Sequence, residues 1–184
     1  MTERVTLITG ASAGIGTELA RVFASNGHRV ALVARRAERL QALAAELGAK
    51  GSAAPIVIPC DLQQTDAGDR IAQALTEAGV EVEYLVNNAG FGLFGLAVTR
   101  DRADQLDMIN VNIRALTDLT LDLPSSAITP ALPAASGRSI LFNSALYGRP
   151  GKRASKPRTS STMRVTVCGR VTSDTMIAAD ASVT

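Results

Sequence analysis

Three glycines near the start of the chain have the spacing of a turn that can hold a phosphate group. They lie in the segment Gly10-Ala11-Ser12-Ala13-Gly14-Ile15-Gly16, between a short apolar run and a helical pattern. Glycine lets the backbone come close to a pyrophosphate, and the start of the next helix offers unpaired N–H groups and a positive dipole end. The segment lacks the Gly-Lys-Ser/Thr ending of a nucleoside triphosphate loop. We therefore expect a dinucleotide here, and the alternative is a tight strand-to-helix turn without a ligand.

The elements that must position this turn alternate along residues 1–122. Short apolar runs predict strands, and apolar stripes at helical spacing predict the helices between them. Parallel strands need crossover connections, which are right-handed. We therefore expect a parallel sheet covered by helices on both faces, with ligands bound beyond the carboxyl ends of its strands. The predicted strands span residues 5–8, 30–33, 56–58, 84–86, 140–142 and 163–168, and the predicted helices span 15–26, 36–47, 67–78 and 102–121.

Composition indicates a globular protein. The chain has 184 residues, 46% of them hydrophobic and 20% charged, which suits one domain with a core. The N-terminus lacks the build of a signal peptide, and no apolar run approaches the roughly 20 residues that span a bilayer. Cys60 and Cys168 lack Cys-x-x-Cys spacing, which favours reduced thiols over a disulfide or a metal site. We therefore expect a cytoplasmic protein with no membrane segment and no metal.

Charge is distributed unevenly along the chain. Residues 1–122 hold 11 Lys or Arg and 15 Asp or Glu, whereas residues 123–184 hold eight and two. A basic surface can bind nucleic acid, but this part of the chain has few aromatic residues for base stacking and no nucleic-acid motif. We therefore expect no nucleic-acid partner.

Four motifs within residues 1–122 resemble the short-chain dehydrogenase/reductase family. They occur in the family's order and at sensible spacing. The resemblance implies a Rossmann-type, doubly wound parallel sheet of seven strands in a three-layer αβα arrangement. It also implies hydride transfer between a nicotinamide dinucleotide and a small carbonyl or alcohol substrate. The motifs are TGASAGIG at 9–16, Asp61-Leu62, NNAG at 87–90 and Asn112.

The end of the second predicted strand indicates which nicotinamide cofactor is bound. A carboxylate there would bind the adenosine ribose and repel a 2′-phosphate, whereas an arginine can hold that phosphate. Ala34 stands where the acid would be, and Arg35 follows it. This favours NADP, although Arg35 and Arg36 could instead be a solvated helix start, and Ala13 lacks the second basic marker of many NADP-preferring relatives.

The remaining cofactor contacts follow from the resemblance. Asp61 and Leu62 are expected at the adenine, and Asn87, Ala89 and Gly90 on the adenosine side of the cleft. The alternative for the NNAG segment is a strand-ending turn, which its composition also suits. The glycine-rich turn is expected to contribute Gly10, Ser12, Ala13, Gly14, Ile15 and Gly16.

Catalysis in the family uses a serine, a tyrosine and a lysine, with an asparagine as a fourth member. By resemblance the catalytic candidates are Asn112, Ser144 and Lys156. The tyrosine position, four residues before the lysine, holds Lys152. Tyr147 lies nine residues before Lys156, so one regular helix could not place the two side chains one turn apart.

The segment 123–163 is atypical for the family. It contains no acidic residue and little apolar periodicity, and the long helix expected after Lys156 is not recognisable. We therefore expect a single dinucleotide-binding domain over residues 1–184 that is incomplete at its C-terminal end, and a homo-oligomer is left open. Two interpretations remain: an NADP-dependent oxidoreductase, or an inactive dinucleotide-binding pseudoenzyme or altered gene product, for example after a shifted reading frame.

Overall fold

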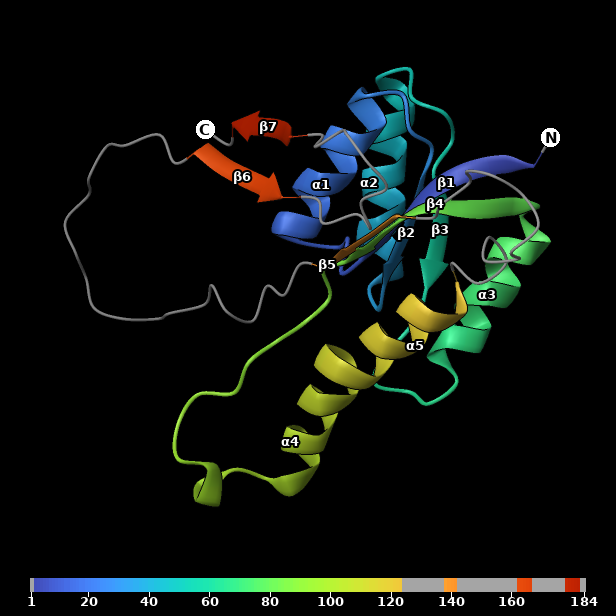
Figure 1. Cartoon of the computed structure of the whole chain (residues 1–184). Helices are drawn as coiled ribbons and strands as arrows, with labels where there is room; N and C mark the ends of the chain where they lie inside the picture. Colours follow the sequence, from blue (N-terminus) through green and yellow to red (C-terminus); the bar gives the residue numbers. More distant parts are fainter. Residues whose placement is uncertain (1, 124–137, 142–161, 167–177, 183–184) are drawn as a thin grey trace, which may run out of the picture.

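Strands and helices alternate along the first two thirds of the chain (Figure 1). The computed structural model describes residues 2–123, 138–141, 162–166 and 178–182. The strands are β1 (Glu3–Thr9), β2 (Val30–Ala34), β3 (Ile56–Pro59), β4 (Val80–Asn87), β5 (Arg138–Leu141), β6 (Thr162–Thr166) and β7 (Ala178–Ser182). The helices are α1 (Ile15–Ser25), α2 (Ala37–Ala49), α3 (Ala67–Glu77), the 3₁₀ turn η1 (Ala97–Thr99), α4 (Arg102–Ile109), the π turn η2 (Asn110–Ala115) and α5 (Leu116–Asp122).

Five strands form a parallel sheet in the order β3-β2-β1-β4-β5. The chain moves outward from β1 to β3, returns to the centre, and continues on the other side through β4 and β5. The prediction of a doubly wound α/β fold is thus confirmed, although the described part of the sheet has five strands instead of the seven that the resemblance implied. The segment predicted as a sixth strand forms β6, which pairs with β7 in a separate antiparallel ribbon.

Helices cover the sheet on both faces, with α1 and α2 on one side and α3 and α5 on the other (Figure 1). The strand β2 shows why the sequence requires two covers, because all five of its residues are buried. Val30, Leu32 and Ala34 join the core beneath α1 and α2, whereas Ala31 and Val33 join the core beneath α3 and α5. Alternate residues of a strand point to opposite faces, so a fully apolar strand needs apolar cover on both.

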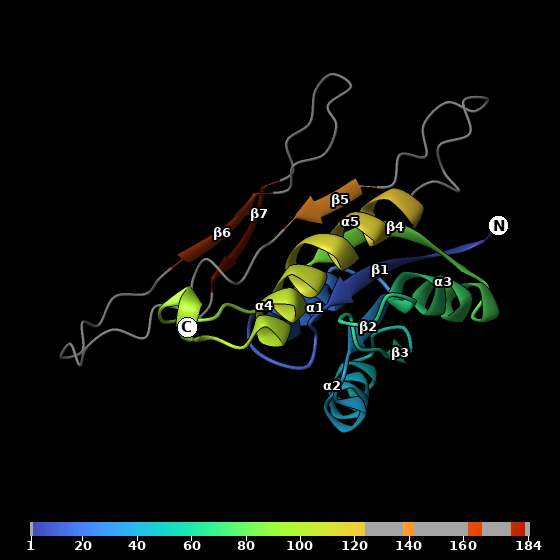
Figure 2. The same ribbon diagram turned by 90° about the horizontal axis from the view of Figure 1, so that it is seen from below.

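One long rod follows β4 and its loop, built from α4, η2 and α5 (Figure 2). The Asp101 carboxylate caps its start by accepting a hydrogen bond of 2.7 Å from the Ala103 N–H. The sequence predicts one regular helix over 102–121, but the structure has a π turn in the middle. Such turns replace i→i+4 hydrogen bonds with i→i+5 bonds and occur frequently at functional sites.

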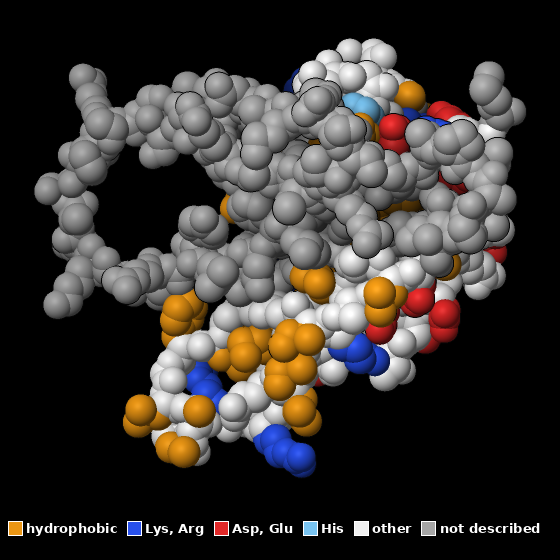
Figure 3. Space-filling model, in the orientation of Figure 1, with side chains coloured by type: hydrophobic (Ala, Val, Ile, Leu, Met, Phe, Trp, Pro, Cys, Tyr) orange, Lys and Arg blue, Asp and Glu red, His pale blue; other side chains and the backbone are white. Residues whose placement is uncertain are grey.

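Apolar side chains lie on the outer surface of this rod and of the loop before it (Figure 3). The exposed large side chains in this region are Phe94, Leu96, Val98, Leu106, Ile109, Ile113 and Leu121. Within the described ranges, no helix has the length and apolar character needed to cross a membrane.

Candidate cofactor and active site

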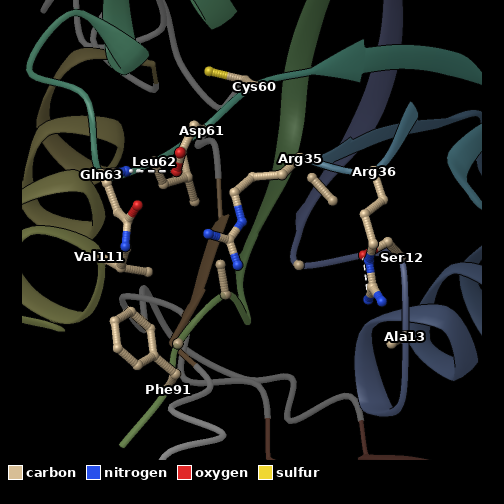
Figure 4. A pocket seen from close by; sticks show the side chains of 14 residues that line it. Ser12, Ala13, Arg35, Arg36, Cys60, Asp61, Leu62, Gln63, Phe91 and Val111 are labelled. Atoms are coloured by element: carbon tan, nitrogen blue, oxygen red, sulfur yellow. Dashed lines mark hydrogen bonds between the residues drawn. The ribbon is translucent and has the colours of Figure 1, made fainter. Parts of the chain in front are cut away.

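A cavity of about 220 Å³ opens at the carboxyl ends of the central strands (Figure 4). Loops that follow β1, β2, β3 and β4 surround it, so it lies where the strand order reverses. Ligands of open α/β sheets bind at this position. Residues with sequence-predicted roles in the lining are Gly10, Ser12, Ala13, Arg35, Asp61, Leu62, Ala89 and Gly90. The cavity is also lined by Gln63, Phe91 and Val111, which no sequence motif marks, and by Cys60, Ala34 and Arg36, to which the sequence assigns no binding role.

Glycines shape the turn after β1 in two different ways. Gly10 has a φ of 68° and Gly14 a φ of 59°, which is backbone that side chains other than glycine's rarely allow. A Cβ at Gly14 would meet nothing within 4 Å, so the backbone there faces open space. A Cβ at Gly16 would lie 2.4 Å from the Gly10 carbonyl oxygen and 2.5 Å from Nδ2 of Asn88. Gly16 therefore allows close packing inside the fold, whereas Gly14 leaves the backbone accessible.

The loops after β1 and β4 are joined by buried hydrogen bonds. The Thr9 hydroxyl donates to the Val86 carbonyl at 3.3 Å and accepts from the N–H groups of Asn88 and Ala89, both at 3.0 Å. Asn88 Nδ2 donates to the Thr9 carbonyl at 2.9 Å. Both side chains are almost fully buried. These bonds fix the NNAG segment against the glycine-rich turn, because the Thr9 hydroxyl accepts from the N–H groups of two residues of that segment, Asn88 and Ala89.

Two arginines border the cavity where β2 ends. Figure 4 shows the Arg35 side chain extending into the cavity, while the Arg36 guanidinium donates to the Ser12 hydroxyl at 3.1 Å. Ala34, at the last position of β2, provides no carboxylate. On the opposite side, the Asp61 carboxylate accepts the Gln63 N–H at 3.1 Å and so is engaged in its own turn. This end of the cavity therefore carries two cationic side chains that suit an anionic ligand.

Residues 4–157 match the family described as short chain dehydrogenase. The chain belongs to this family. It is 37% identical over 155 residues to nodulation protein G from Rhizobium sp. (strain N33), covering 83% of this chain and 60% of that protein. It is 42% identical over 109 residues to a probable NADP-dependent dehydrogenase from Dichelobacter nodosus, covering 59% of this chain and 99% of that protein.

Solved structures of short-chain dehydrogenases resemble the chain as well. A short-chain dehydrogenase from Sphingobium yanoikuyae in complex with NADPH has a TM-score of 0.65 at 33% identity, covering 76% of this chain and 52% of that one. A metagenomic short-chain oxidoreductase in complex with NADP has a TM-score of 0.65 at 37% identity, covering 77% and 62%. The chain spans 60% of nodulation protein G and 45% of the serine 3-dehydrogenase of Agrobacterium fabrum, to which it is also similar.

In this family member, Asn112 lies in the π turn η2 and faces the loop after β4. Its Oδ1 accepts the Phe91 N–H at 3.1 Å, and its Nδ2 donates to the Phe91 carbonyl at 2.8 Å. The amide thus holds both backbone groups of one cavity-lining residue. The other catalytic candidates, Ser144 and Lys156, and also Tyr147, lie outside the described residues.

Four residues predicted at the cofactor do not line the described cavity. Gly14, Ile15 and Gly16 lie at or just inside the start of α1, beside the cavity. Asn87 is 2% exposed, and its Nδ2 donates to the Thr120 hydroxyl at 2.9 Å, so this amide ties β4 to α5. An asparagine at the end of a strand can bind groups of the protein core or bind a ligand, and the sequence alone does not distinguish these two roles.

Cys60 contributes an apolar wall to the cavity. Burial raises the pKa of its thiol, and the Sγ atom lies 3.8 Å from the Ala67 carbonyl oxygen. The thiol is therefore protonated at neutral pH and is a poor nucleophile. Cys168 lies outside the described residues.

Proposed function

We propose that this chain is an NADP-dependent oxidoreductase that transfers a hydride between NADP(H) and a carbonyl or alcohol substrate. One observation carries the cofactor assignment: Arg35 and Arg36 border the cavity at the end of β2, and Ala34 leaves no carboxylate to oppose a 2′-phosphate. A guanidinium can bind a phosphate through two charged hydrogen bonds.

The residues around the cavity fit such a dinucleotide. Gly14 leaves backbone facing open space, and no side chain caps the start of α1, so its first N–H groups can meet a pyrophosphate. Asp61, Leu62, Ala89 and Gly90 all line the cavity. Asp61 and Leu62 would contact the adenine, and Ala89 and Gly90 would lie on the adenosine side of the cleft. NADPH, when bound, supplies the hydride.

The protein's own contribution to catalysis is orientation and proton transfer. Asn112 holds the backbone of Phe91 in place beside the cavity. By the family pattern, Ser144 would orient the substrate carbonyl, and Lys156 would hold a ribose hydroxyl and lower the pKa of the acid. Tyr147 is the phenol available between these two residues in the sequence, and a small-molecule carbonyl or alcohol is the expected substrate.

A reducing, cytoplasmic setting accompanies this proposal. It is supported by the buried, free thiol of Cys60.

Fluorescence titration with NADPH and NADH tests the cofactor assignment. We expect NADPH to bind more tightly, and Arg35→Ala to weaken NADPH binding by roughly 10- to 100-fold, because a hydrogen bond to a charged group contributes about 1.5–3 kcal/mol. NADH affinity should hardly change. Arg39→Ala is the matched control, because Arg39 is an exposed arginine of α2 outside the cavity lining. Equal affinities for the two cofactors in the unaltered protein would contradict the proposal.

Turnover separates the enzyme from a dinucleotide-binding protein without activity. Lys152 occupies the position at which the family has its usual proton donor, a tyrosine. A positioned acid contributes a factor of about 10² to 10⁴ to the rate of reaction. NADPH oxidation on a panel of aldehydes and ketones that disappears in Tyr147→Phe would identify Tyr147 as the acid. Cofactor binding without turnover on any of them would support the inactive alternative.

A further inference from the structure

Arg114 connects the rod to the rim of the cavity. It lies in the π turn η2, two residues after Asn112, and its side chain is half-buried. Its Nη2 donates to the Gln63 carbonyl at 3.0 Å, across 51 positions of the sequence. The Nε atom is buried and has no hydrogen-bond partner among the described residues. Within the described residues, the guanidinium thus meets the β3 loop through the Gln63 carbonyl.

The carbonyl that Arg114 holds belongs to the turn that follows β3. In this turn the Gln63 N–H donates to the Asp61 carboxylate at 3.1 Å, and the Gln64 N–H donates to the Asp61 carbonyl at 3.1 Å. Asp61, Leu62 and Gln63 all line the cavity. The turn's own bonds fix its internal shape, but the Arg114 contact fixes its position relative to the rod.

The same π turn also holds the opposite wall of the cavity. Asn112 binds both backbone groups of Phe91, in the loop after β4, and Val111 lies in the lining itself. Three residues within one turn therefore reach the cavity directly or hold its two walls. A change at Arg114 would release the β3 wall and leave the β4 wall in place.

We propose that Arg114 is a positioning residue that fixes the Asp61–Gln63 turn for the adenosine half of the cofactor. The inference rests on the proposed function, because that turn borders the expected adenine position. Arg114 does not itself line the cavity. It acts through the Gln63 carbonyl, and its loss should weaken binding of the adenosine half without altering the nicotinamide half.

The test compares binding of NADPH, of 2′,5′-ADP and of nicotinamide mononucleotide by Arg114→Gln, Arg114→Lys and the unaltered protein. We expect Arg114→Gln to raise the Kd of NADPH and of 2′,5′-ADP together by about tenfold, the size of one lost hydrogen bond to a charged group. Arg114→Lys keeps a charged donor and should recover part of this loss. The Kd of nicotinamide mononucleotide should not change. Hydrogen exchange at residues 61–64 should rise in parallel.

Arg29→Gln is the matched control. Arg29 also donates to a backbone carbonyl, that of Ala54 at 2.9 Å, but it precedes β2 at the far end of the sheet. The Arg29→Gln substitution should lower the Tm without changing the Kd of any of the three ligands. An unchanged Kd for 2′,5′-ADP in Arg114→Gln would overturn the inference, and if that variant does not fold, an unchanged value in Arg114→Met, which keeps the apolar stem but has no donor, would do so. Failure of the unaltered protein to bind NADPH would instead contradict the proposed function.

Discussion

The two ends of the central sheet are held by different kinds of contact. At the amino end, charged and aromatic side chains mainly meet one another: Arg29 pairs with Glu3 in addition to binding the Ala54 carbonyl, and the rings of Phe23, His28 and Tyr84 lie 5.2–5.9 Å apart. At the carboxyl end, buried uncharged side chains, those of Thr9 and Asn88 among them, bind the backbone of the loops. A side chain bound to another side chain leaves loop backbone free to move, whereas a side chain bound to backbone fixes it. The loops around the cavity are therefore the more precisely positioned.

Among the substitutions that test this comparison, those at glycines should change the free energy of unfolding most. We expect Gly16→Ala to lower the free energy of unfolding by about 3 kcal/mol or more, because its Cβ would lie 2.4 Å from a backbone oxygen in tightly packed surroundings. Gly48→Ala, near the end of α2, is the control. Its Cβ would meet nothing within 4 Å, so alanine should stabilise the protein by about 0.5–1 kcal/mol. Urea unfolding measures both, and equal effects would contradict the distinction.

Two buried threonines of β1 give the next largest contrast. Thr9→Val removes an acceptor shared by two N–H groups and should cost about 3 kcal/mol, because both donors lose their partner. The Thr6 hydroxyl is equally buried and has no hydrogen-bond partner among the described residues. Thr6→Val should therefore be neutral or stabilising by about 1 kcal/mol. Thermal and urea unfolding of both variants test this pair, and a Thr6→Val loss as large as that of Thr9→Val would refute it.

The smallest effect is expected where α1 meets α2. The hydrogen bond from Arg21, followed by that from Lys50, lowers the pKa of Glu46 from its ordinary value to about 2. Because the folded pKa lies below the unfolded one, the contribution is present above pH 4.5 and is lost as the pH falls toward 2. Glu46→Gln should reduce the difference in Tm between pH 6 and pH 3. Glu81→Gln, an exposed acid of β4 with no ion pair in the described part, should leave that difference unchanged.

The sequence predicts the sheet better than the rod. Strands such as 30–33 are visible as continuous apolar runs because a parallel strand is buried on both faces, and β2 occupies Val30–Ala34. The π turn at Asn110–Ala115 carries no comparable sign. Within this turn, Asn112 binds the backbone of Phe91, which lies 21 positions earlier in the sequence. The apolar periodicity of one segment does not reveal such contacts with another segment.

At the site, the motifs predict where the loops lie but not how each side chain is used. Gly10, Ser12 and Ala13 of the glycine-rich turn border the cavity, as do Arg35 and Asp61-Leu62. Arg36 was open to interpretation as a solvated helix start, and only its contact with Ser12 reveals its orientation. No sequence pattern marks Arg114, because it binds a backbone carbonyl, and every type of residue has one.

The π turn also changes the angular phase of the rod. The buried residues of the rod, Val111, Ala115 and Leu119, are spaced by four. In a regular α-helix each such step drifts about 40° around the axis. The wider turn counteracts this drift and keeps the three side chains in line against the sheet. A π turn takes up about one residue more than an α turn, so loss of a single residue there would restore the ordinary pitch and leave the rest of the rod nearly in phase. Leu119 would then still face the core, so a deletion within this turn should be tolerated better than a deletion within the regular helix α4, which would rotate the rest of the rod by about 100°.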